Sequence, residues 1–244
     1  MAYQVAIDIG NTRTKLGLFE GKELLHSKEF NNSDMANNTL IFNEYEANNV
    51  IISSVNSKVE GHFKNDLGEK NVVYLNHQTS LPIKLLYQSP ETLGKDRIAS
   101  AVAAHSLFPD RNVLSIDAGT CITYDLVNME GSYLGGAITP GVQMRLKSMN
   151  DYTDKLPLVH WDGHNLPKSV GNTTITSMLS GVINGCMGEM KEFIHAYQKQ
   201  YKKLFIVLTG GDANFFEKAL KNGIFADPNL VLIGLNEILL YNCE

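Results

Sequence analysis

The chain of 244 residues has only three cysteines, Cys121, Cys186 and Cys243. They form neither an even set for disulfides nor a pair at the spacing of a metal finger, so a reducing compartment is the simpler inference. No apolar run approaches the ~20 residues needed to cross a bilayer. The N-terminus, Met1–Gln4, lacks the basic and apolar regions of a signal peptide. We therefore expect a cytoplasmic protein that does not bind membranes.

The chain also has no excess of positive charge. Its formal net charge is −5 and its pI is near 5.8, which argues against a surface that binds nucleic acid. An anionic ligand would therefore need a local positive site. Hydrophobic residues make up 43% and charged residues 19% of the sequence, so a packed core is expected and disorder is not.

Several common catalytic motifs are missing from the sequence. No Gly-x-x-x-x-Gly-Lys-Ser/Thr segment is present, and no Gly-x-Gly-x-x-Gly follows a strand, which excludes the two commonest nucleotide loops. The absence of Gly-x-Ser-x-Gly and His-Glu-x-x-His weakens an interpretation as a serine hydrolase or a zinc protease. The seven histidines are scattered, which is typical of surface or core residues rather than of metal ligands.

One short phrase, in contrast, occurs twice. Residues 7–12 read Ile-Asp-Ile-Gly-Asn-Thr and residues 116–121 read Ile-Asp-Ala-Gly-Thr-Cys, with the aspartates 109 positions apart. Each copy ends a strand-like run and precedes another. Internal repetition of this kind predicts two homologous halves that face one cleft. We place the boundary near Arg111, which gives domains at 1–111 and 112–244.

The first copy has the chemistry of a phosphate site. The alternation of apolar residues predicts an antiparallel hairpin, in which Gly10 is expected to adopt a positive φ and to let a ligand approach the backbone. Asn11, Thr12 and the turn amides can donate hydrogen bonds to phosphate oxygens, and Lys15 supplies a mobile charge. Asp8 needs a cation between itself and a phosphate, so it is a candidate for holding Mg²⁺. A simple hairpin with an Asx-type turn is the alternative.

Strands alternate with helices along the rest of the chain, which indicates an α/β fold. The long periodic helix has methionines and aromatic residues at core spacing. The predicted strands cover 50–55, 72–75, 113–117, 122–126 and 204–208, the predicted helices cover 38–46, 57–68, 175–201, 215–220 and a segment after Gly94, and turns or loops are expected at 81–91 and 135–141.

The segment Gly94-Lys95-Asp96-Arg97 lies where a helix begins. Helix N-termini attract anions, and Arg97 can hold a carboxylate or phosphate with two hydrogen bonds whereas Lys95 offers a point charge. Asp96 could accept a proton from an alcohol that attacks a γ-phosphate. The alternative is that Asp96 only caps the helix or pairs with Arg97.

Two other segments have more than one interpretation. The glycines of Thr209–Asp212 could leave room for a flat base such as adenine, or could form a tight turn between a strand and a helix. Asn172 and Thr173 stand at the start of the long helix, where capping alone explains both residues.

Taken together and in order, these motifs resemble those of the type III pantothenate kinases. The matching segments are Asp8–Lys15, Tyr87, Gly94–Arg97, Asp117–Thr120, Gly136–Gly141 and Asn172–Thr173. The resemblance implies an acetate-kinase/Hsp70/actin-like α/β fold with two duplicated ribonuclease-H-like domains around a central cleft. It also implies a homodimer that phosphorylates pantothenate with ATP to 4′-phosphopantothenate, the first step of coenzyme A biosynthesis.

The resemblance further implies roles for individual residues, with Asp96 as the catalytic base. Asp8 is expected near Mg²⁺, and Asp117 is expected to bind a monovalent cation, K⁺ or NH₄⁺. The implied ATP-binding residues are Asp8, Ile9, Gly10, Asn11, Thr12, Arg13, Thr14, Lys15 and Thr120. The implied pantothenate-binding residues are Tyr87, Gly94, Lys95, Asp96, Arg97 and Thr173.

The sequence departs from the family pattern at two positions. Lys95 stands where a small residue is usual, and Cys121 replaces the common Ala after the second Asp-x-Gly-Thr. Two alternative functions stay open at this point. One is a kinase for another small alcohol, and the other is a non-catalytic nucleotide-binding regulatory protein of the same fold.

Overall fold

The computed structural model describes residues 3–37, 47–68, 70–220 and 223–243. The helix predicted at 38–46 lies outside these residues. The strands are β1 (Tyr3–Ile9), β2 (Arg13–Glu20), β3 (Glu23–Asn31), β4 (Ala47–Ser54), β5 (Asn71–Tyr74), β6 (Lys84–Leu85), β7 (Val113–Ala118), β8 (Cys121–Val127), β9 (Ser132–Pro140), β10 (Phe205–Thr209) and β11 (Ile224–Ala226). The α-helices are α2 (Ser57–Asp66), α3 (Lys95–Leu107), α4 (Val142–Asp151), α5 (Thr174–Gln200), α6 (Ala213–Leu220) and α7 (Leu230–Cys243), with 3₁₀ turns η1 (Asn32–Asn37) and η2 (Pro90–Thr92).

The chain divides into two compact units. Unit 1 consists of Met1–Pro109, Gly131–Tyr133 and Asn229–Glu244, and unit 2 consists of Asp110–Glu130 and Leu134–Pro228. This division differs from the predicted domains mainly in the C-terminal helix α7, which belongs to unit 1. The helix is apolar around most of its circumference, so it needs partners on several sides. It packs against α3, β1 and β4 of unit 1.

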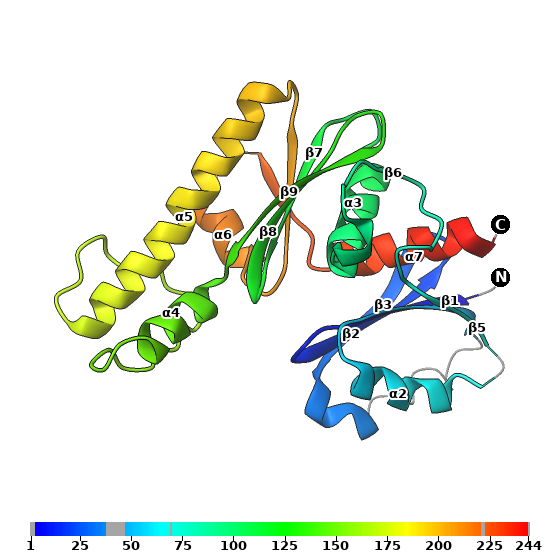
Figure 1. The fold of residues 1–244 in the computed structure, drawn as a ribbon, viewed down its shortest axis with the longest axis horizontal. Coiled ribbons are helices and arrows are strands. Elements are labelled where there is room, and N and C mark those ends of the chain that lie inside the picture. The colour runs from blue at the N-terminus through cyan, green and yellow to red at the C-terminus, as the bar shows by residue number, and fades with distance from the viewer. Residues whose placement is uncertain (1–2, 38–46, 69, 221–222, 244) are drawn as a thin grey trace. The chain divides into compact units, whose positions relative to one another are not determined.

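Unit 1 is built on a five-stranded sheet in the order β3-β2-β1-β4-β5. Strands β1 and β2 form the predicted antiparallel hairpin, and β1 runs parallel to β4. Val5, Ile7 and Ile9 share a core cluster with Phe63 of α2, so α2 covers one face of the sheet. The helices α3 and α7 lie side by side (Figure 1), and α7 packs against the strands.

Unit 2 repeats this arrangement. Its strands follow the order β9-β8-β7-β10-β11, and the short β6 of unit 1 pairs with Ser132 and Tyr133, the residues of β9 that also belong to unit 1. Strand β7 is antiparallel to β8 and parallel to β10, as β1 is to β2 and β4. The apolar residues of β7, β8 and β10 share a core with α4, α5 and α6. The repeated Asp-x-Gly phrase therefore marks the same hairpin in two sheets of the same topology.

The turn predicted at 135–141 was wrong for most of its length, because residues 132–140 form the strand β9. Gly136 serves close strand packing instead. A Cβ atom on Gly136 would lie only 1.5 Å from the backbone oxygen of Tyr124 on β8. Glycine in this strand thus marks a close backbone approach rather than a reversal of the chain.

The long helix is confirmed as α5, and its periodic face is core. Met178, Ile183, Cys186 and Met190 are buried in the cluster beneath the sheet of unit 2. In the part of the chain that the structure describes, no helix combines the length and apolarity needed to span a bilayer.

Candidate functional site

The two repeated aspartates occupy equivalent places in the two sheets. Asp8 is the penultimate residue of β1 and lies opposite Ser53 on the parallel strand β4. Asp117 is the penultimate residue of β7 and lies opposite Thr209 on the parallel strand β10. Ligands of α/β sheets bind outside the carboxyl ends of such strands, so each aspartate stands where a ligand is expected.

Asp8 lies in an unfavourable electrostatic environment. Burial, followed by the negative charge of Asp96, raises the pKa of Asp8 to about 6, while the Ser53 hydroxyl and Lys15 act in the opposite direction. The structure therefore brings together two of the predicted residues, Asp8 and Asp96, from distant parts of the sequence. Two carboxylates that repel each other fit a site for a divalent cation shared with phosphates.

The first turn of α3 fixes the place of Asp96. Its Oδ1 atom accepts a hydrogen bond of 2.8 Å from the backbone amide of Arg97. A Cβ atom on Gly94 would lie 2.5 Å from the same oxygen. Glycine at position 94 therefore leaves the space that the carboxylate occupies. Helix capping and the proposed chemistry both use this position, so the contact alone does not separate the two interpretations.

Arg97 and Tyr87 are also brought together. The guanidinium carbon of Arg97 lies 5.9 Å from the centre of the Tyr87 ring, which in turn lies 5.9 Å from the ring of Tyr133. Arg97 is buried. A buried guanidinium beside an aromatic ring is suited to an anionic organic ligand, because the ring holds the group in one orientation.

Lys95 has a structural partner. Its Nζ atom donates a hydrogen bond of 3.0 Å to the backbone oxygen of Ser54, at the end of β4. The lysine that departs from the family pattern thus ties the start of α3 to the sheet edge near Ser53 and Asp8. This contact satisfies one donor of the ammonium group.

The turn between β1 and β2 is closed by a backbone hydrogen bond. The amide of Gly10 donates to the oxygen of Arg13 at 2.9 Å, and Gly10 is not among the glycines with positive φ, so that expectation was wrong. A Cβ atom there would lie 3.1 Å from the Arg13 oxygen. Close packing of the turn, not a left-handed backbone, favours glycine at this position.

The charged residues of this hairpin have different surroundings. Arg13 is exposed and forms a salt bridge of 2.9 Å with Glu29, which also lies 3.8 Å from Lys15. Asn11 and Thr12 are exposed, whereas Ile9 and Thr14 are buried. The side-chain amide of Asn11 and the hydroxyl of Thr12 are therefore accessible to phosphate oxygens. The buried side chains of Ile9 and Thr14 instead pack inside unit 1 and support the hairpin.

Asn32 is a residue of this site that sequence reasoning missed. Its side-chain nitrogen donates to the backbone oxygens of Gly10 and Asn11, at 3.0 and 3.1 Å. Its side-chain oxygen accepts from the hydroxyl of Thr14 at 2.8 Å. Asn32 therefore holds the hairpin turn in place. It lies in an Asn-rich polar stretch of the sequence, and only the pairing of β2 with β3 singles it out.

Two glycines make room for the carboxylate of Asp117 in unit 2. A Cβ atom would lie 2.3 Å from Asp117 Oδ1 if built on Gly210, and 3.3 Å from it if built on Gly119. Gly210 has a φ of +92°, so the tight-turn interpretation of this segment holds for it. No atom lies within 4 Å of a Cβ built on Gly211, which is exposed, so no side chain or backbone blocks a flat base from approaching that position. A carboxylate in a glycine-lined recess fits a cation with oxygen ligands.

Thr120 and Thr173 are both exposed residues of unit 2. Thr120 follows Asp117 and Gly119 in the turn between β7 and β8. Thr173 is the N-cap of α5 and forms a capping box with Thr176, whose amide donates to the Thr173 hydroxyl at 3.2 Å. Capping thus accounts for Thr173 within the protein.

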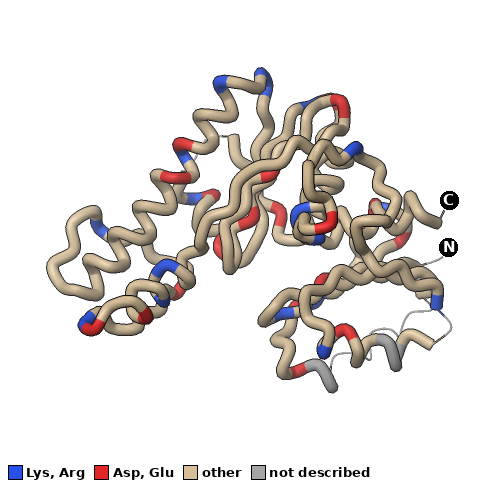
Figure 2. The backbone as a smooth tube through the Cα atoms, in the orientation of Figure 1, with Lys and Arg blue, Asp and Glu red and all other residues tan. Residues whose placement is uncertain are grey.

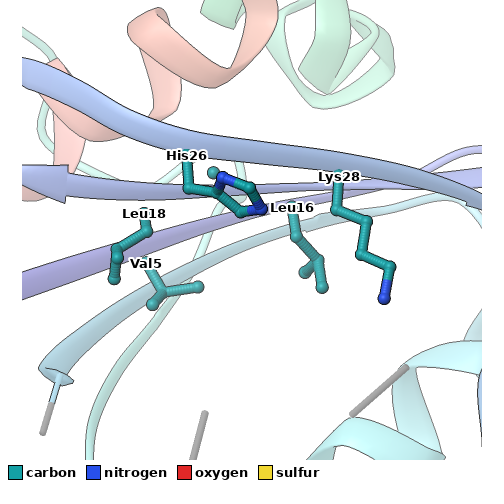
Figure 3. Close-up of a pocket in the computed structure, with 6 residues that line it drawn as sticks. Val5, Leu16, Leu18, His26 and Lys28 are labelled. Atoms are coloured by element: carbon teal, nitrogen blue, oxygen red, sulfur yellow. The ribbon is translucent and has the colours of Figure 1, made fainter. Parts of the chain in front are cut away.

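A small hollow in unit 1 has a different character (Figure 3). Its walls are aliphatic side chains of β1 and β2, together with His26 and Lys28 of β3. None of the predicted site residues lines it. The hollow is therefore separate from the Asp8–Asp96 cluster.

Comparisons with known proteins bear on this site. A family model described as type III pantothenate kinase matches residues 4–196. The chain is 43% identical over 238 residues to a type III pantothenate kinase of Phocaeicola vulgatus, with 97% of each chain covered. It is 42% identical over 238 residues to the type III pantothenate kinase of Cytophaga hutchinsonii, with 98% of this chain and 99% of the relative covered.

The structure is also similar to that of a glucokinase from an Antarctic psychrotroph. The TM-score is 0.56 and the identity 11%, with 99% of each chain covered. At such an identity the likeness shows the fold alone. It confirms the expected acetate-kinase/Hsp70/actin-like class.

Proposed function

This chain belongs to the type III pantothenate kinases and phosphorylates pantothenate in coenzyme A biosynthesis, and we propose that Asp96 is the base of that reaction. The observation that supports this assignment is the proximity of Asp96 to Asp8 at the end of β1, seen in the raised pKa of Asp8. A carboxylate that accepts a proton during phosphoryl transfer is expected beside the cation that binds the phosphates.

In the proposed reaction the 4′-hydroxyl of pantothenate attacks the γ-phosphorus of ATP. The hydroxyl proton passes to the Asp96 carboxylate, the new O–P bond forms, and the bond between the γ-phosphorus and the bridging oxygen breaks to release ADP. Arg97 and Tyr87 bind the pantothenate molecule, with Gly94 and Lys95 shaping the start of α3. Most of the rate enhancement then comes from positioning and charge stabilisation.

We assign the ATP phosphates to the hairpin turn that Asp8 and Lys15 flank. The exposed residues Asn11 and Thr12, in a turn whose backbone oxygens are held by Asn32, support this assignment. Asp8 would hold Mg²⁺ directly or through water, and the mutual repulsion of Asp8 and Asp96 fits such an ion. When bound, Mg²⁺ neutralises the charge that develops on the phosphates.

In unit 2 we assign Thr120 to the ATP phosphates and Thr173 to pantothenate. Asp117 would hold a monovalent cation, K⁺ or NH₄⁺, with its carboxylate, for which Gly119 and Gly210 leave room. Such an ion adds positive charge near the nucleotide. The unobstructed approach to Gly211 suits the adenine base.

A homodimer in the cytoplasm is the proposed working state. Several large apolar side chains of unit 2 are exposed, namely Ile138, Met144, Tyr152, Leu158, Leu166, Val170 and Ile175. They lie on β9, α4, the following segment and the start of α5. The first half of α5 has no charged position (Figure 2). An exposed apolar surface of this kind is typical of an interface between subunits.

The test is ADP release from ATP with and without pantothenate, repeated with Na⁺ in place of K⁺. The proposal expects release only when pantothenate and K⁺ are both present. Release with another small alcohol but not with pantothenate would contradict it, and absence of release with every alcohol would favour a regulatory role.

A further inference from the structure

A group of polar side chains in unit 2 lies outside all the residues assigned above. Glu189 of α5 receives hydrogen bonds from three side chains of other elements. Its Oε1 atom accepts from the hydroxyl of Thr139 at 2.7 Å and from that of Tyr124 at 3.3 Å. Its Oε2 atom accepts from Arg145 at 2.7 Å. A side chain with this many partners holds several elements in one arrangement.

Arg145 uses its two sides for different partners. While one terminal nitrogen binds Glu189, its Nε atom donates to the backbone oxygen of Pro140 at 2.7 Å. Thr139 and Pro140 are thus both fixed, one by Glu189 and the other by Arg145. Because the guanidinium group is rigid and planar, the bond to Glu189 fixes the direction of the bond to Pro140.

The segment held in this way packs onto the turn between β7 and β8. The amide of Gly141 donates to the backbone oxygen of Thr120 at 3.0 Å. A Cβ atom on Gly141 would lie 2.2 Å from the oxygen of Gly119 and 2.6 Å from that of Thr120. Neither segment can shift toward the other, so the position of 139–141 determines that of the turn.

The Arg145–Glu189 pair is largely shielded from solvent. The side chains are 22% and 24% exposed, and Tyr124 beside them is fully buried. Burial, with the charge of Glu189, raises the pKa of Tyr124, so its hydroxyl remains a donor. Removal of one partner from such a group leaves the other poorly compensated.

We propose that Glu189 and Arg145 are positioning residues for phosphoryl transfer, which hold segment 139–141 against the Gly119–Thr120 turn and thereby place Thr120. The inference rests on the proposed contact of Thr120 with the ATP phosphates. Neither residue touches substrate. Their effect reaches the reaction only through the backbone of Gly141.

The test compares Glu189→Gln with Glu192→Gln. Gln at 189 keeps the size of the side chain but removes the negative charge that faces Arg145 and leaves one acceptor oxygen for three donors, whereas Glu192 is an exposed residue of the same helix. We expect Glu189→Gln to lower kcat/KM for ATP by about 10- to 100-fold, since small misplacements of binding groups have effects of this size. The KM for pantothenate should change by less than about twofold. Glu192→Gln should have normal kinetic constants for both substrates.

Thr120→Ala separates this inference from the proposed function. If Thr120→Ala impairs ATP use and Glu189→Gln does not, the positioning role is wrong while the assignment of Thr120 stands. If Thr120→Ala has a normal KM and kcat for ATP, that assignment fails and the inference fails with it. A lower melting temperature of Glu189→Gln with normal kinetic constants would also overturn the proposal. Arg145→Lys, which keeps the charge and only one of the two bonds, replaces Glu189→Gln if the latter does not fold.

Discussion

Asp96 and Asp8 show at the scale of single residues how the fold brings distant carboxylates together. The two carboxylates are 88 positions apart in the sequence. The register of β1 and the start of α3 bring them close enough for one charge to act on the other. The arrangement costs stability in the ligand-free protein. In the proposed site, a cation and phosphates bound between the groups would make it favourable.

The proposed role of Asp96 predicts a specific kinetic defect. Asp96→Asn keeps the size of the side chain and the contact with the Arg97 amide, but removes the proton acceptor. We expect kcat to fall by ~10²- to 10⁴-fold, the usual contribution of a general base. Dissociation constants for ATP and pantothenate, measured by calorimetry, should stay near normal.

Glu23→Gln, at an exposed position of β3, is the matched control. It changes the net charge by the same amount and should have a normal kcat. Near-normal turnover of Asp96→Asn would reject Asp96 as the base.

The pKa of Asp8 predicts how stability depends on pH. Folding raises this pKa from 3.8 to about 6, so the native state binds more protons than the unfolded state between these values. Stability from this group is therefore complete below about pH 4 and is lost as the pH rises through 6. Asp8→Asn should be more stable than the parent above pH 6, on the order of 1–3 kcal/mol because one pKa unit corresponds to ~1.4 kcal/mol.

Urea denaturation of the ligand-free protein at pH 4 and pH 8 measures this difference. The two proteins should be nearly equal at pH 4. A stability difference that is the same at both values of pH would contradict the raised pKa.

At the scale of secondary-structure elements, local patterns predicted some features well and others poorly. The β1–β2 hairpin is confirmed, because Val5, Ile7 and Ile9 alternate with smaller or polar residues as a strand requires. The segment 135–140 was predicted wrongly, because glycines that allow close strand packing look like turn residues in the sequence. Asn32 was missed since its role depends on the pairing of β2 with β3.

The packing of α7 on α3 predicts a strong effect of one small substitution. A Cβ atom on Gly234 would lie 1.8 Å from the backbone oxygen of Ala99. Gly234→Ala must therefore separate the two helices, and overpacking of this kind costs about 1–3 kcal/mol or more. Thermal and urea denaturation should both show the loss.

Gly61→Ala in α2 is the control for this substitution. No atom lies within 4 Å of a Cβ at Gly61, so the change should stabilise the protein by roughly 0.5–1 kcal/mol because alanine restricts the unfolded chain. Equal effects of the two substitutions would contradict the packing argument.

For the whole molecule, the exposed apolar surface of unit 2 predicts that assembly can be disrupted by one charge. Val170 is 80% exposed. If it lies in the proposed dimer interface, Val170→Asp places an unpaired carboxylate there, and such burial is strongly unfavourable. Light scattering coupled to gel filtration should then show a monomer.

Leu25→Asp, on β3 of unit 1, is the control and should leave the mass unchanged. Leu25 is 43% exposed and belongs to none of the assigned sites. A dimer that persists in Val170→Asp and dissociates in Leu25→Asp would place the interface elsewhere.

The sequence by itself determined the α/β class and the duplicated hairpin, because these depend on short-range periodicity and on a repeated motif, whereas the proposed site residues rest largely on the resemblance to the type III pantothenate kinases. Tertiary structure decided which of those residues meet. The proximity of Asp8 to Asp96, the support from Asn32 and the place of α7 in unit 1 arise from packing between distant segments. Such contacts follow from how apolar faces are buried together, which no local pattern encodes.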